Sequence, residues 1–335
     1  MPVTRLTRLF MPATWMGALA ALMSGAALSA EPAATFPSKP VTIVLPFVAG
    51  ASTDIETRLY QQRLMEDLKQ PVLIDYKPGA GASLGAIYVA KAVPDGYTIL
   101  AITPGFPVYA AFFPPDKLPY DPVKDFAPIT LINKRSAMLL VNANFPARNF
   151  KEYVAYAKAN PGKINFGTSG GGGIFHIAGA WLHSLTNTQA TFIHYKGAGP
   201  MNTDLVAGRV DAGPGLPFVV APFIKSGKVV AIANLTAARS KFMPDLVPVA
   251  EQGFPEYDYS SWSAYLAPAK TPPALVNRWN TAFVHVAKAP EIVQRMAADS
   301  AEMVGSTPEV AAKQIATEYA RYRKVISDNG IKMEE

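Results

Sequence analysis

Val41-Thr-Ile-Val-Leu-Pro-Phe-Val-Ala-Gly-Ala-Ser-Thr-Asp54 is the stretch that decides the fold of this chain. Its first five residues are apolar or β-branched and predict a buried strand, which Pro46 ends. Small residues then form a turn, and Thr53 and Glu56 have the spacing of a capping box, which predicts that a helix begins near Thr53. The free N–H groups and the dipole of a helix N-terminus attract anions. The stretch therefore predicts either an anion-binding turn or an ordinary strand-to-helix connection.

The order of strand, small-residue loop and helix recurs along the chain. A strand at 72–76 precedes the loop Lys77-Pro-Gly-Ala-Gly-Ala-Ser83 and a helix, and a third strand covers 97–102. This alternation predicts parallel strands with right-handed connections. The segment from Thr103 to Asp125 is rich in proline and aromatic residues and predicts an irregular loop.

A second α/β series begins after strands at 129–132 and 138–141. Its elements are expected as helix 149–159, strand 164–166, helix 174–185, strand 191–194, helix 201–207, a helix ending at 226–227 and strand 229–234. A strand near 257–266 and helices at 273–286, 290–298 and 308–327 complete the chain. We predict an α/β fold of two lobes, each a mostly parallel sheet flanked by helices. Residues 36–133 plus 258–335 form lobe 1, residues 134–257 form lobe 2, two crossing strands join them, and the C-terminal helices cover lobe 1.

Residues 1–30 differ from the rest of the chain. Arg5 and Arg8 are the only charged residues among them, and an apolar run from Leu9 to Leu28 is followed by Ser29-Ala30. A basic start, an apolar middle and a small-residue end are typical of a secretory signal peptide, with cleavage expected between positions 27 and 30. The run is also long enough for the alternative, an uncleaved membrane anchor.

Composition limits the possible partners and cofactors. The 335 residues are 50% hydrophobic and 17% charged, with a net charge of +6 that falls to about +4 without the predicted signal. No run of Lys or Arg occurs, so nucleic acid is not an expected partner, whereas a mild positive field helps to attract small anions. The chain has no cysteine, and its histidines lack the close spacing of metal ligands, so no cofactor or metal is expected. The histidines are His176, His183, His194 and His285.

An enzyme alternative comes from Gly167-Thr-Ser-Gly-Gly171, which matches the G-x-S-x-G nucleophile elbow of serine hydrolases. Ser169 would be the nucleophile, Asp211 or Asp258 the orienting acid and His285 the base. Against this reading, His285 is predicted in the middle of a helix, where the motif requires a loop. The glycines that follow also suit the close approach of a ligand to the backbone.

Three loops of small residues each follow a predicted strand and open a predicted helix: Gly50-Ala-Ser-Thr53, Gly79-Ala-Gly-Ala-Ser83 and Thr168-Ser-Gly-Gly-Gly-Gly173. Ligands of open α/β sheets bind beyond the carboxyl ends of the strands, so loops of the two lobes could face each other across a cleft. A hydrogen bond to a charged group contributes about 1.5–3 kcal/mol. A few such bonds at each end of a dicarboxylate would reach the roughly 8 kcal/mol of micromolar affinity.

Longer motifs in a fixed order resemble one known family. They are Pro46-Phe-Val-Ala-Gly-Ala-Ser-Thr-Asp54, Lys77-Pro-Gly-Ala-Gly-Ala-Ser-Leu-Gly85, Pro94-Asp-Gly-Tyr-Thr98, Leu118-Pro-Tyr-Asp-Pro-Val-Lys-Asp-Phe-Ala-Pro128, Tyr195-Lys-Gly-Ala-Gly-Pro200 and Gly330-Ile-Lys332. Over nearly all of the chain after the signal, they resemble the Bug/TctC family of periplasmic solute-binding proteins of tripartite tricarboxylate transporters. The resemblance implies a two-lobed, type II-like periplasmic binding protein fold without enzyme activity or cofactor. It also implies a periplasmic monomer that binds a small carboxylate and the membrane components of the transporter.

The resemblance places a ligand site between the lobes, with one carboxylate on the first two loops and the other end on the second lobe. The ligand-binding residues it implies are Phe47, Ala49, Gly50, Ala51, Ser52, Thr53, Gly79, Ala80, Gly81, Ala82, Ser83, Thr103, Thr168, Ser169, Gly170, Gly171, Gly172, Gly173, His176, Tyr195 and Gly197. Asp54 is expected to fix its loop rather than to contact an anionic ligand. His176 is expected either to donate to the distal end of the ligand or to pack under the loop.

Two departures from the family predict a distinct ligand selectivity. Ala51 and Ala82 stand where the family usually has a second glycine, and each added methyl narrows the floor of the site. Ala212-Gly-Pro-Gly-Leu-Pro217 replaces a segment that usually holds apolar residues and Phe. Aromatic side chains either suit an aromatic carboxylate or pack the loop: Phe106, Tyr109, Phe112, Phe113 and Phe175. An aliphatic di- or tricarboxylate is the alternative ligand. Two roles also stay open: delivery of the ligand to a transporter, and presentation of the ligand-loaded protein to a membrane sensor kinase.

Overall fold

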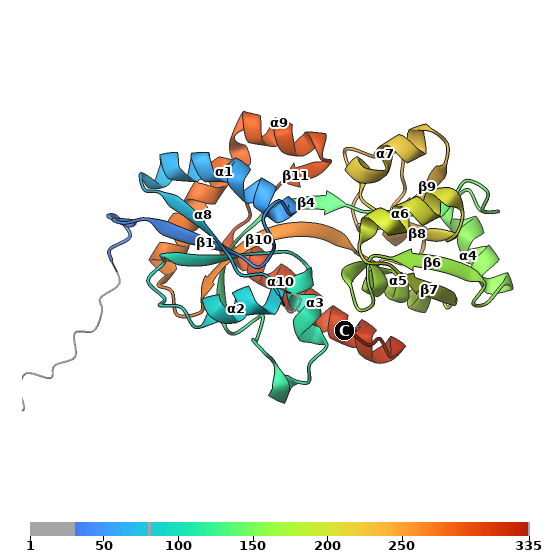
Figure 1. Ribbon diagram of the computed structural model, residues 1–335, viewed down its shortest axis with the longest axis horizontal. Coiled ribbons are helices and arrows are strands. Elements are labelled where there is room, and N and C mark those ends of the chain that lie inside the picture. The colour runs from blue at the N-terminus through green and yellow to red at the C-terminus, as the bar shows by residue number, and fades with distance from the viewer. Residues whose placement is uncertain (1–30, 80–81, 334–335) are drawn as a thin grey trace, which may run out of the picture.

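The computed structural model describes residues 31–79 and 82–333 of the chain. Two lobes lie side by side, each built on one β-sheet with helices on both faces (Figure 1). The predicted signal peptide lies outside the described residues. Within the described part of the chain, no helix is long and apolar enough to cross a membrane.

The sheet of the first lobe has six strands in the order β11-β4-β10-β3-β1-β2. The strands are β1 (Val41–Leu45), β2 (Val72–Tyr76), β3 (Thr98–Ile102), β4 (Phe126–Ser136), β10 (Ser260–Pro268) and β11 (Ala301–Met303). One face carries α1 (Ser52–Leu68), α8 (Pro273–Lys288) and α9 (Pro290–Ala298), and the other carries α2 (Ser83–Ala90), α3 (Gly105–Ala111) and α10 (Pro308–Asn329). The C-terminal helices therefore cover the first lobe, as predicted.

The sheet of the second lobe has five strands in the order β7-β6-β8-β5-β9. The strands are β5 (Met138–Asn142), β6 (Ile164–Thr168), β7 (Ala190–His194), β8 (Ala212–Gly215) and β9 (Val229–Asn234). Its helices are α4 (Phe150–Ala159), α5 (Ile174–Leu185), α6 (Ala198–Ala207) and α7 (Pro217–Lys225). These helices pack against the sheet and form two buried hydrophobic clusters with it.

The two-lobed α/β fold is confirmed, but both sheets are mixed rather than mostly parallel. β1 pairs in parallel with β2 and β3, and β6 with β7 and β8. β10 runs antiparallel to β3 and β4, β11 to β4, and β5 to β8 and β9. Every antiparallel pair contains β4, β5 or β10, the strands next to the points where the chain passes between the lobes. The βαβ pattern of the sequence does not include these strands.

Two predictions of local structure are wrong. The segment from Thr103 to Asp125 contains α3 and a 3₁₀ turn at Pro115–Lys117, because its aromatic side chains pack together in a buried cluster. Phe106 stacks on Tyr120 at 4.8 Å between ring centroids, with the Phe126 ring at 5.2 Å from Phe106. β8 was not predicted either, because glycine and proline are poor strand formers and its burial between β5 and β6 overrides this preference.

The predicted capping box at the start of α1 is also wrong. The N-cap is Ala51, without a side-chain cap, and the helix begins at Ser52. Glu56 is buried and pairs with Arg135 of β4 at 2.5 Å. Glu56 also accepts a hydrogen bond from Ser263 of β10, so its carboxylate joins α1 to both central strands instead of capping the helix.

α10 continues beyond the first lobe and packs against the second one (Figure 1). Tyr322 and Val325 belong to the same buried core as α5. The Arg321 guanidinium lies 4.7 Å from the centre of the Trp181 ring of α5 and donates to the Asp258 carbonyl. The C-terminal helix is thus a third connection between the lobes, beside the two crossings of the chain at 136–138 and 257–260.

Candidate ligand-binding cleft

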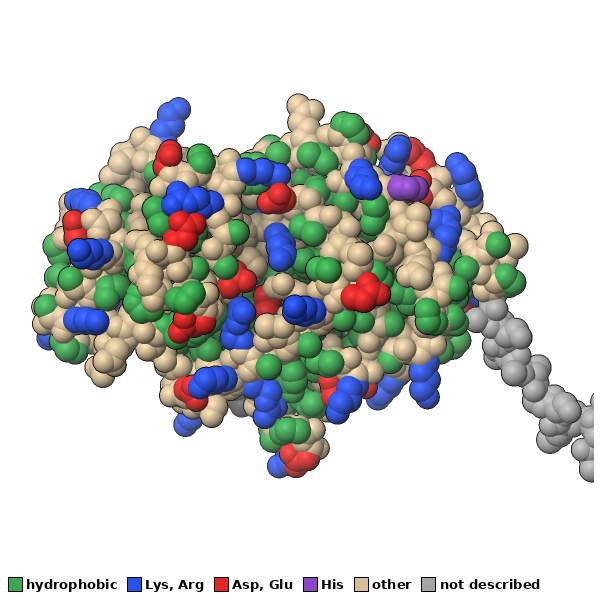
Figure 2. Space-filling model, turned by 180° about the vertical axis from the view of Figure 1, so that it is seen from behind, with side chains coloured by type: hydrophobic (Ala, Val, Ile, Leu, Met, Phe, Trp, Pro, Cys, Tyr) green, Lys and Arg blue, Asp and Glu red, His purple; other side chains and the backbone are tan. Residues whose placement is uncertain are grey.

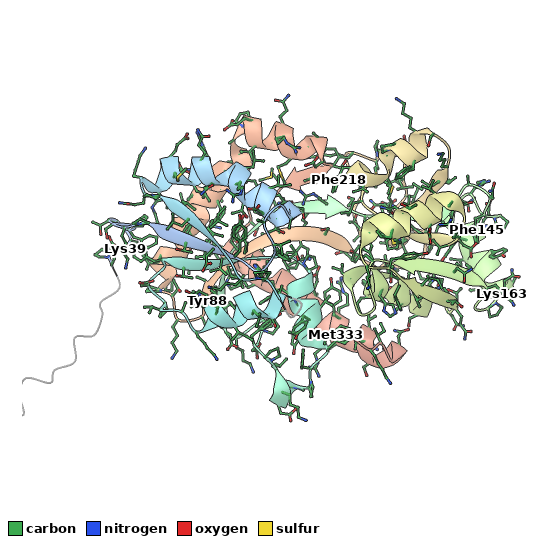
Figure 3. All side chains as sticks on the ribbon, viewed as in Figure 1. Lys39, Tyr88, Phe145, Lys163, Phe218 and Met333 are labelled. Carbon is green, nitrogen blue, oxygen red and sulfur yellow. The ribbon has the colours of Figure 1, made fainter. Side chains whose placement is uncertain are left out.

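A cleft of about 1000 Å³ opens between the two lobes. From the first lobe it is lined by Phe47, Ala51, Ser52, Thr53, Thr103, Pro104, Gly105, Val108, Tyr109 and Phe112. From the second lobe it is lined by Ser169, Gly171, Gly172, Gly173, Ile174, Phe175, Gly197, Ala198 and Leu216. Tyr259 and Ser261 of the crossing segment and Met333 near the C-terminus complete the lining, and Figure 3 shows Met333 beside α3.

The beginnings of helices from both lobes surround the cleft. The N-cap residues Ala51 of α1, Gly173 of α5, Gly197 of α6 and Leu216 of α7 all line it, and none of these helices has a side-chain cap. The first N–H groups of a helix have no intrahelical acceptor. The cleft therefore collects helix starts, whose first N–H groups lack an intrahelical acceptor, and the positive ends of several helix dipoles, which together favour an anion.

The lining carries no formal charge: none of the residues that the structure describes there is Asp, Glu, Lys, Arg or His. Hydroxyl groups come from both lobes and from the crossing segment, in Ser52, Thr53, Thr103, Tyr109, Ser169, Tyr259 and Ser261. The remaining walls are largely apolar, with Phe47, Val108, Phe112, Ile174, Phe175, Leu216 and Met333. An anion would therefore be bound by dipoles and hydroxyls, and its body would lie against apolar side chains.

Asp54 holds the first-lobe loop in place. Gly50 has a φ of +82°, and its N–H donates to the Asp54 carboxylate at 2.7 Å. The Tyr76 hydroxyl and the Arg58 Nε also donate to Asp54, at 2.7 and 2.9 Å. Burial raises the pKa of Asp54, but the bonds from Gly50 and Tyr76 and the charge of Arg58 outweigh it and keep the pKa below its ordinary value. The prediction that Asp54 fixes the loop is confirmed.

The glycine loop of the second lobe, Gly170–Gly173, approaches the first lobe closely. Gly172 has a φ of +69°, and a Cβ atom built on it would lie 3.0 Å from the ring of Phe112, the residue that follows α3. Its N–H donates to the His176 Nδ1 at 3.0 Å. Glycine is required at this position by both the backbone conformation and the contact.

Ten of the predicted ligand-binding residues line the cleft: Phe47, Ala51, Ser52, Thr53, Thr103, Ser169, Gly171, Gly172, Gly173 and Gly197. Nine others are not part of this lining: Ala49, Gly50, Gly79, Ala82, Ser83, Thr168, Gly170, His176 and Tyr195. Ala80 and Gly81 lie outside the described residues. Tyr195 donates its hydroxyl to Asp204 at 2.8 Å, and Ser83 is buried at the start of α2.

His176 lies beneath the glycine loop. Its ring is 4.5 Å from that of His194 and 4.8 Å from that of Phe192, and it lines a separate groove of about 700 Å³. This arrangement favours the alternative in which His176 packs under the loop, and a donor role toward the ligand stays a prediction. In residues 31–79 and 82–333, no cluster of His, Asp or Glu could hold a metal ion.

The residues of the proposed hydrolase triad are not brought together. Ser169 lines the cleft, whereas His285 lies exposed on α8 with its Nδ1 3.1 Å from Asp67. Asp211 accepts from the Asn165 N–H at 2.8 Å, and Asp258 from the Ala237 N–H at 3.0 Å. Each candidate acid therefore accepts a hydrogen bond from the backbone instead of orienting a histidine.

The structure also adds residues that the sequence did not indicate. They are Pro104, Gly105, Val108, Ile174, Ala198, Tyr259, Ser261 and Met333. Pro104 and Gly105 lie just after Ile102, the last residue of β3. Ligands of α/β sheets bind beyond the carboxyl ends of the strands, and this is the signal that points to both residues. Ser261 and Met333 reach the cleft through tertiary contacts alone, for which the sequence has no local signal.

Two lobes joined by crossing strands around an uncharged cleft define the class of solute-binding proteins. The family model described as "Tripartite tricarboxylate transporter family receptor", TctC, matches residues 57–331. The chain belongs to the TctC family, as its motifs predicted. Members of this family are solute-binding receptors, so the chain is a binding protein and not an enzyme.

The chain is similar to several known proteins over most of its length. A UPF0065 protein of Agrobacterium vitis is 35% identical over 299 residues, 88% of this chain and 86% of that protein. BugT of Bordetella pertussis is 30% identical over 299 residues, 89% of this chain and 92% of BugT. A structure of an R. palustris protein with adipate has a TM-score of 0.72 and 30% identity, covering 89% of this chain and all of that one. MatC from Rhodopseudomonas palustris with bound malate has a TM-score of 0.70 and 30% identity, covering 87% of this chain and all of MatC.

Proposed function

We propose that the chain is exported to the periplasm, captures a small organic carboxylate in the cleft and delivers it to the membrane components of a tripartite tricarboxylate-type transporter. One observation carries the proposal: uncapped helix starts from both lobes converge on a cleft whose described lining has no formal charge. The similar proteins with adipate and malate support the ligand class. Family membership supports the transporter partner.

Backbone donors and hydroxyls would bind the carboxylate from both lobes. Ser52 and Thr53 open α1, and Ser169 precedes the glycine loop at the start of α5, so each end of the site combines hydroxyls with the first N–H groups of a helix, which have no intrahelical acceptor. A hydrogen bond to a charged group is worth about 1.5–3 kcal/mol, so three or four suffice for micromolar binding. Because no Lys or Arg lines the described part of the cleft, release would not require breaking an ion pair.

The body of the ligand would be apolar. Tyr109 of α3 and the following Phe112 come from one lobe, Phe175 of α5 comes from the other, and all three line the same cleft. Aromatic and aliphatic walls stabilise apolar surface by about 25 cal/mol per Å² buried. The cleft therefore favours an aromatic carboxylate or an aliphatic dicarboxylate with a hydrocarbon chain over a compact tricarboxylate.

Closure of the lobes would follow from binding across the cleft. The proposed lobes are 36–133 with 258–335, and 134–257, and the chain passes between the sheets at 136–138 and 257–260. A ligand that contacts α1 on one lobe and α5 on the other stabilises the closed arrangement by its differential affinity for it.

A panel of carboxylates tests the proposal by thermal unfolding and calorimetry. Succinate, malate, adipate, benzoate and terephthalate cover the candidate classes, and a ligand at 100 times its Kd adds about 2.7 kcal/mol of stability. Ser169→Ala should weaken the best ligand about tenfold, and Ser226→Ala, an exposed serine at the end of α7, is the matched control. Absence of any response in the wild-type protein contradicts the proposal.

A further inference from the structure

The end of α10 is fixed against the second lobe. Gly330 ends the helix with a φ of +59°, which reverses the chain direction. The Ile331 N–H then donates to the Ile326 carbonyl at 3.1 Å, and the Ile331 side chain is buried in the core that contains α5. The C-terminal segment, Ile331–Met333, therefore has a defined starting point and direction.

This segment meets the glycine loop and α3 at one point. A Cβ on Gly172 would lie 3.1 Å from the Met333 Cα and 3.3 Å from the Lys332 carbonyl oxygen. The same Cβ would lie 3.0 Å from the Phe112 ring. Three segments that are far apart in the sequence thus touch at a position where only glycine fits, and Figure 3 shows Met333 at this junction.

The junction separates two hollows. Met333 and Gly172 line the cleft of about 1000 Å³. Lys332 lines the groove of about 700 Å³, the histidine groove, together with His176 and His194. The Gly172 N–H donates to His176, so one side of the loop faces the cleft and the other is held by a residue of the groove. The neighbouring residues Lys332 and Met333 therefore line different hollows.

We propose that the C-terminal segment is the end wall of the ligand cleft and sets the length of the carboxylate that the protein accepts; this rests on the proposed function. Met333 closes the cleft with a flexible side chain that is partly exposed. Removal of Lys332 and Met333 joins the cleft to the histidine groove. A longer ligand then places its distal carboxylate among polar groups of that groove, such as Ser184, Thr188 and His194.

The proposal is tested by measuring, with calorimetry, the affinities of unbranched α,ω-dicarboxylates of four to ten carbons for the wild type and for variants of the C-terminal segment. The variants are Met333→Ala, Met333→Trp and a chain that ends at Ile331. The controls are a chain that ends at Met333 and Met65→Ala, an exposed methionine of α1. The shortened chain should prefer ligands at least two carbons longer than the wild type does. Each methylene that gains burial should raise affinity about fourfold, while the affinity for short ligands changes less than twofold.

The side-chain variants keep the test independent of the truncation. Met333 is not in the core, so Met333→Ala should shift the preferred length upward and Met333→Trp downward in folded proteins. If the wild type binds a carboxylate and all three variants keep its preference for ligand length, the proposal of an end wall is wrong. The proposed function is not contradicted by that result. A wild-type protein that binds no member of the series and no other carboxylate overturns both.

Discussion

Replacing Glu318 by glutamine should remove a loss of stability that the wild-type protein suffers as the pH rises. Glu318 lies buried on α10 and accepts hydrogen bonds from Trp262 of β10, from Tyr322 and from Gln314, at 2.7–3.1 Å. Burial raises the pKa of Glu318 to about 7, against the opposing effects of these three donors and of Arg321. This cluster joins the C-terminal helix to a strand that crosses between the lobes.

The sign and size of this change in the free energy of unfolding follow from proton linkage. Between the ordinary value of 4.5 and about 7, the folded protein holds a proton on Glu318 that the unfolded chain has lost, so stability falls as the pH rises. The full effect is present below pH 4.5 and is lost above pH 7. For these two pKa values, the loss between pH 5 and pH 8 is about 2–3 kcal/mol.

Denaturant unfolding at pH 5 and pH 8 measures this loss directly. The wild type should lose about 2–3 kcal/mol more than Glu318→Gln does over this range. Glu256→Gln, an exposed glutamate in a loop, is the matched control and should behave like the wild type. Equal pH dependence in the wild type and Glu318→Gln would refute the argument, because it would mean that the donors keep the carboxylate ionised at all these pH values.

Three further changes have defined outcomes. Asp54→Asn should cost about 1.5–3 kcal/mol of stability and weaken carboxylate binding, because the bond that holds Gly50 loses its charge; unchanged affinity in calorimetry contradicts this. Burial lowers the pKa of His183 to about 4, so between pH 7.5 and pH 5 the wild type should lose about 2 kcal/mol relative to His183→Gln in denaturant unfolding, and equal changes in the two proteins contradict this. Gly179→Ala should destabilise by about 1–3 kcal/mol, since its Cβ would lie 2.5 Å from Phe166; a gain in melting temperature would show that helix propensity outweighs the clash.

The sequence predicts the elements well where apolar periodicity and stop signals agree. The strand Val229–Asn234 and the helices Ile174–Leu185 and Pro290–Ala298 have the predicted bounds, and glycine, proline or asparagine marks most of their ends. β8 and α3 are missed because tertiary packing, rather than local preference, forms them. Pairing between strands that lie far apart in the sequence, such as β4 with β10 and β5 with β9, has no local signal, so the mixed order of the sheets does not follow from the sequence pattern.

The residues of the candidate site also fall into those that a local sequence pattern predicts and those that only tertiary contacts bring to the cleft. The starts of α1 and α5 are predicted because small residues directly follow a strand, and the structure brings both to the cleft. The false capping box shows the limit of such spacing: Glu56 reaches Arg135, 79 positions later in the chain, instead of its own helix N-terminus. Met333 is a cleft residue only because Gly330 turns the chain back and Ile331 anchors it.

The charged groups beside the cleft explain how an uncharged site can be specific for an anion. Asp54 would repel a carboxylate at the start of α1, but it is paired with Arg58 and saturated by the Gly50 and Tyr76 donors. Those bonds orient the loop whose N–H groups remain for the ligand. On the proposed function, affinity for a carboxylate would therefore depend on the position of backbone donors, which a few buried bonds fix, and not on a charged side chain of the cleft. On the proposed function, a change in the walls, such as Met333 at the end of the cleft, would change the ligand, while the helix starts that would bind its carboxylates stay the same.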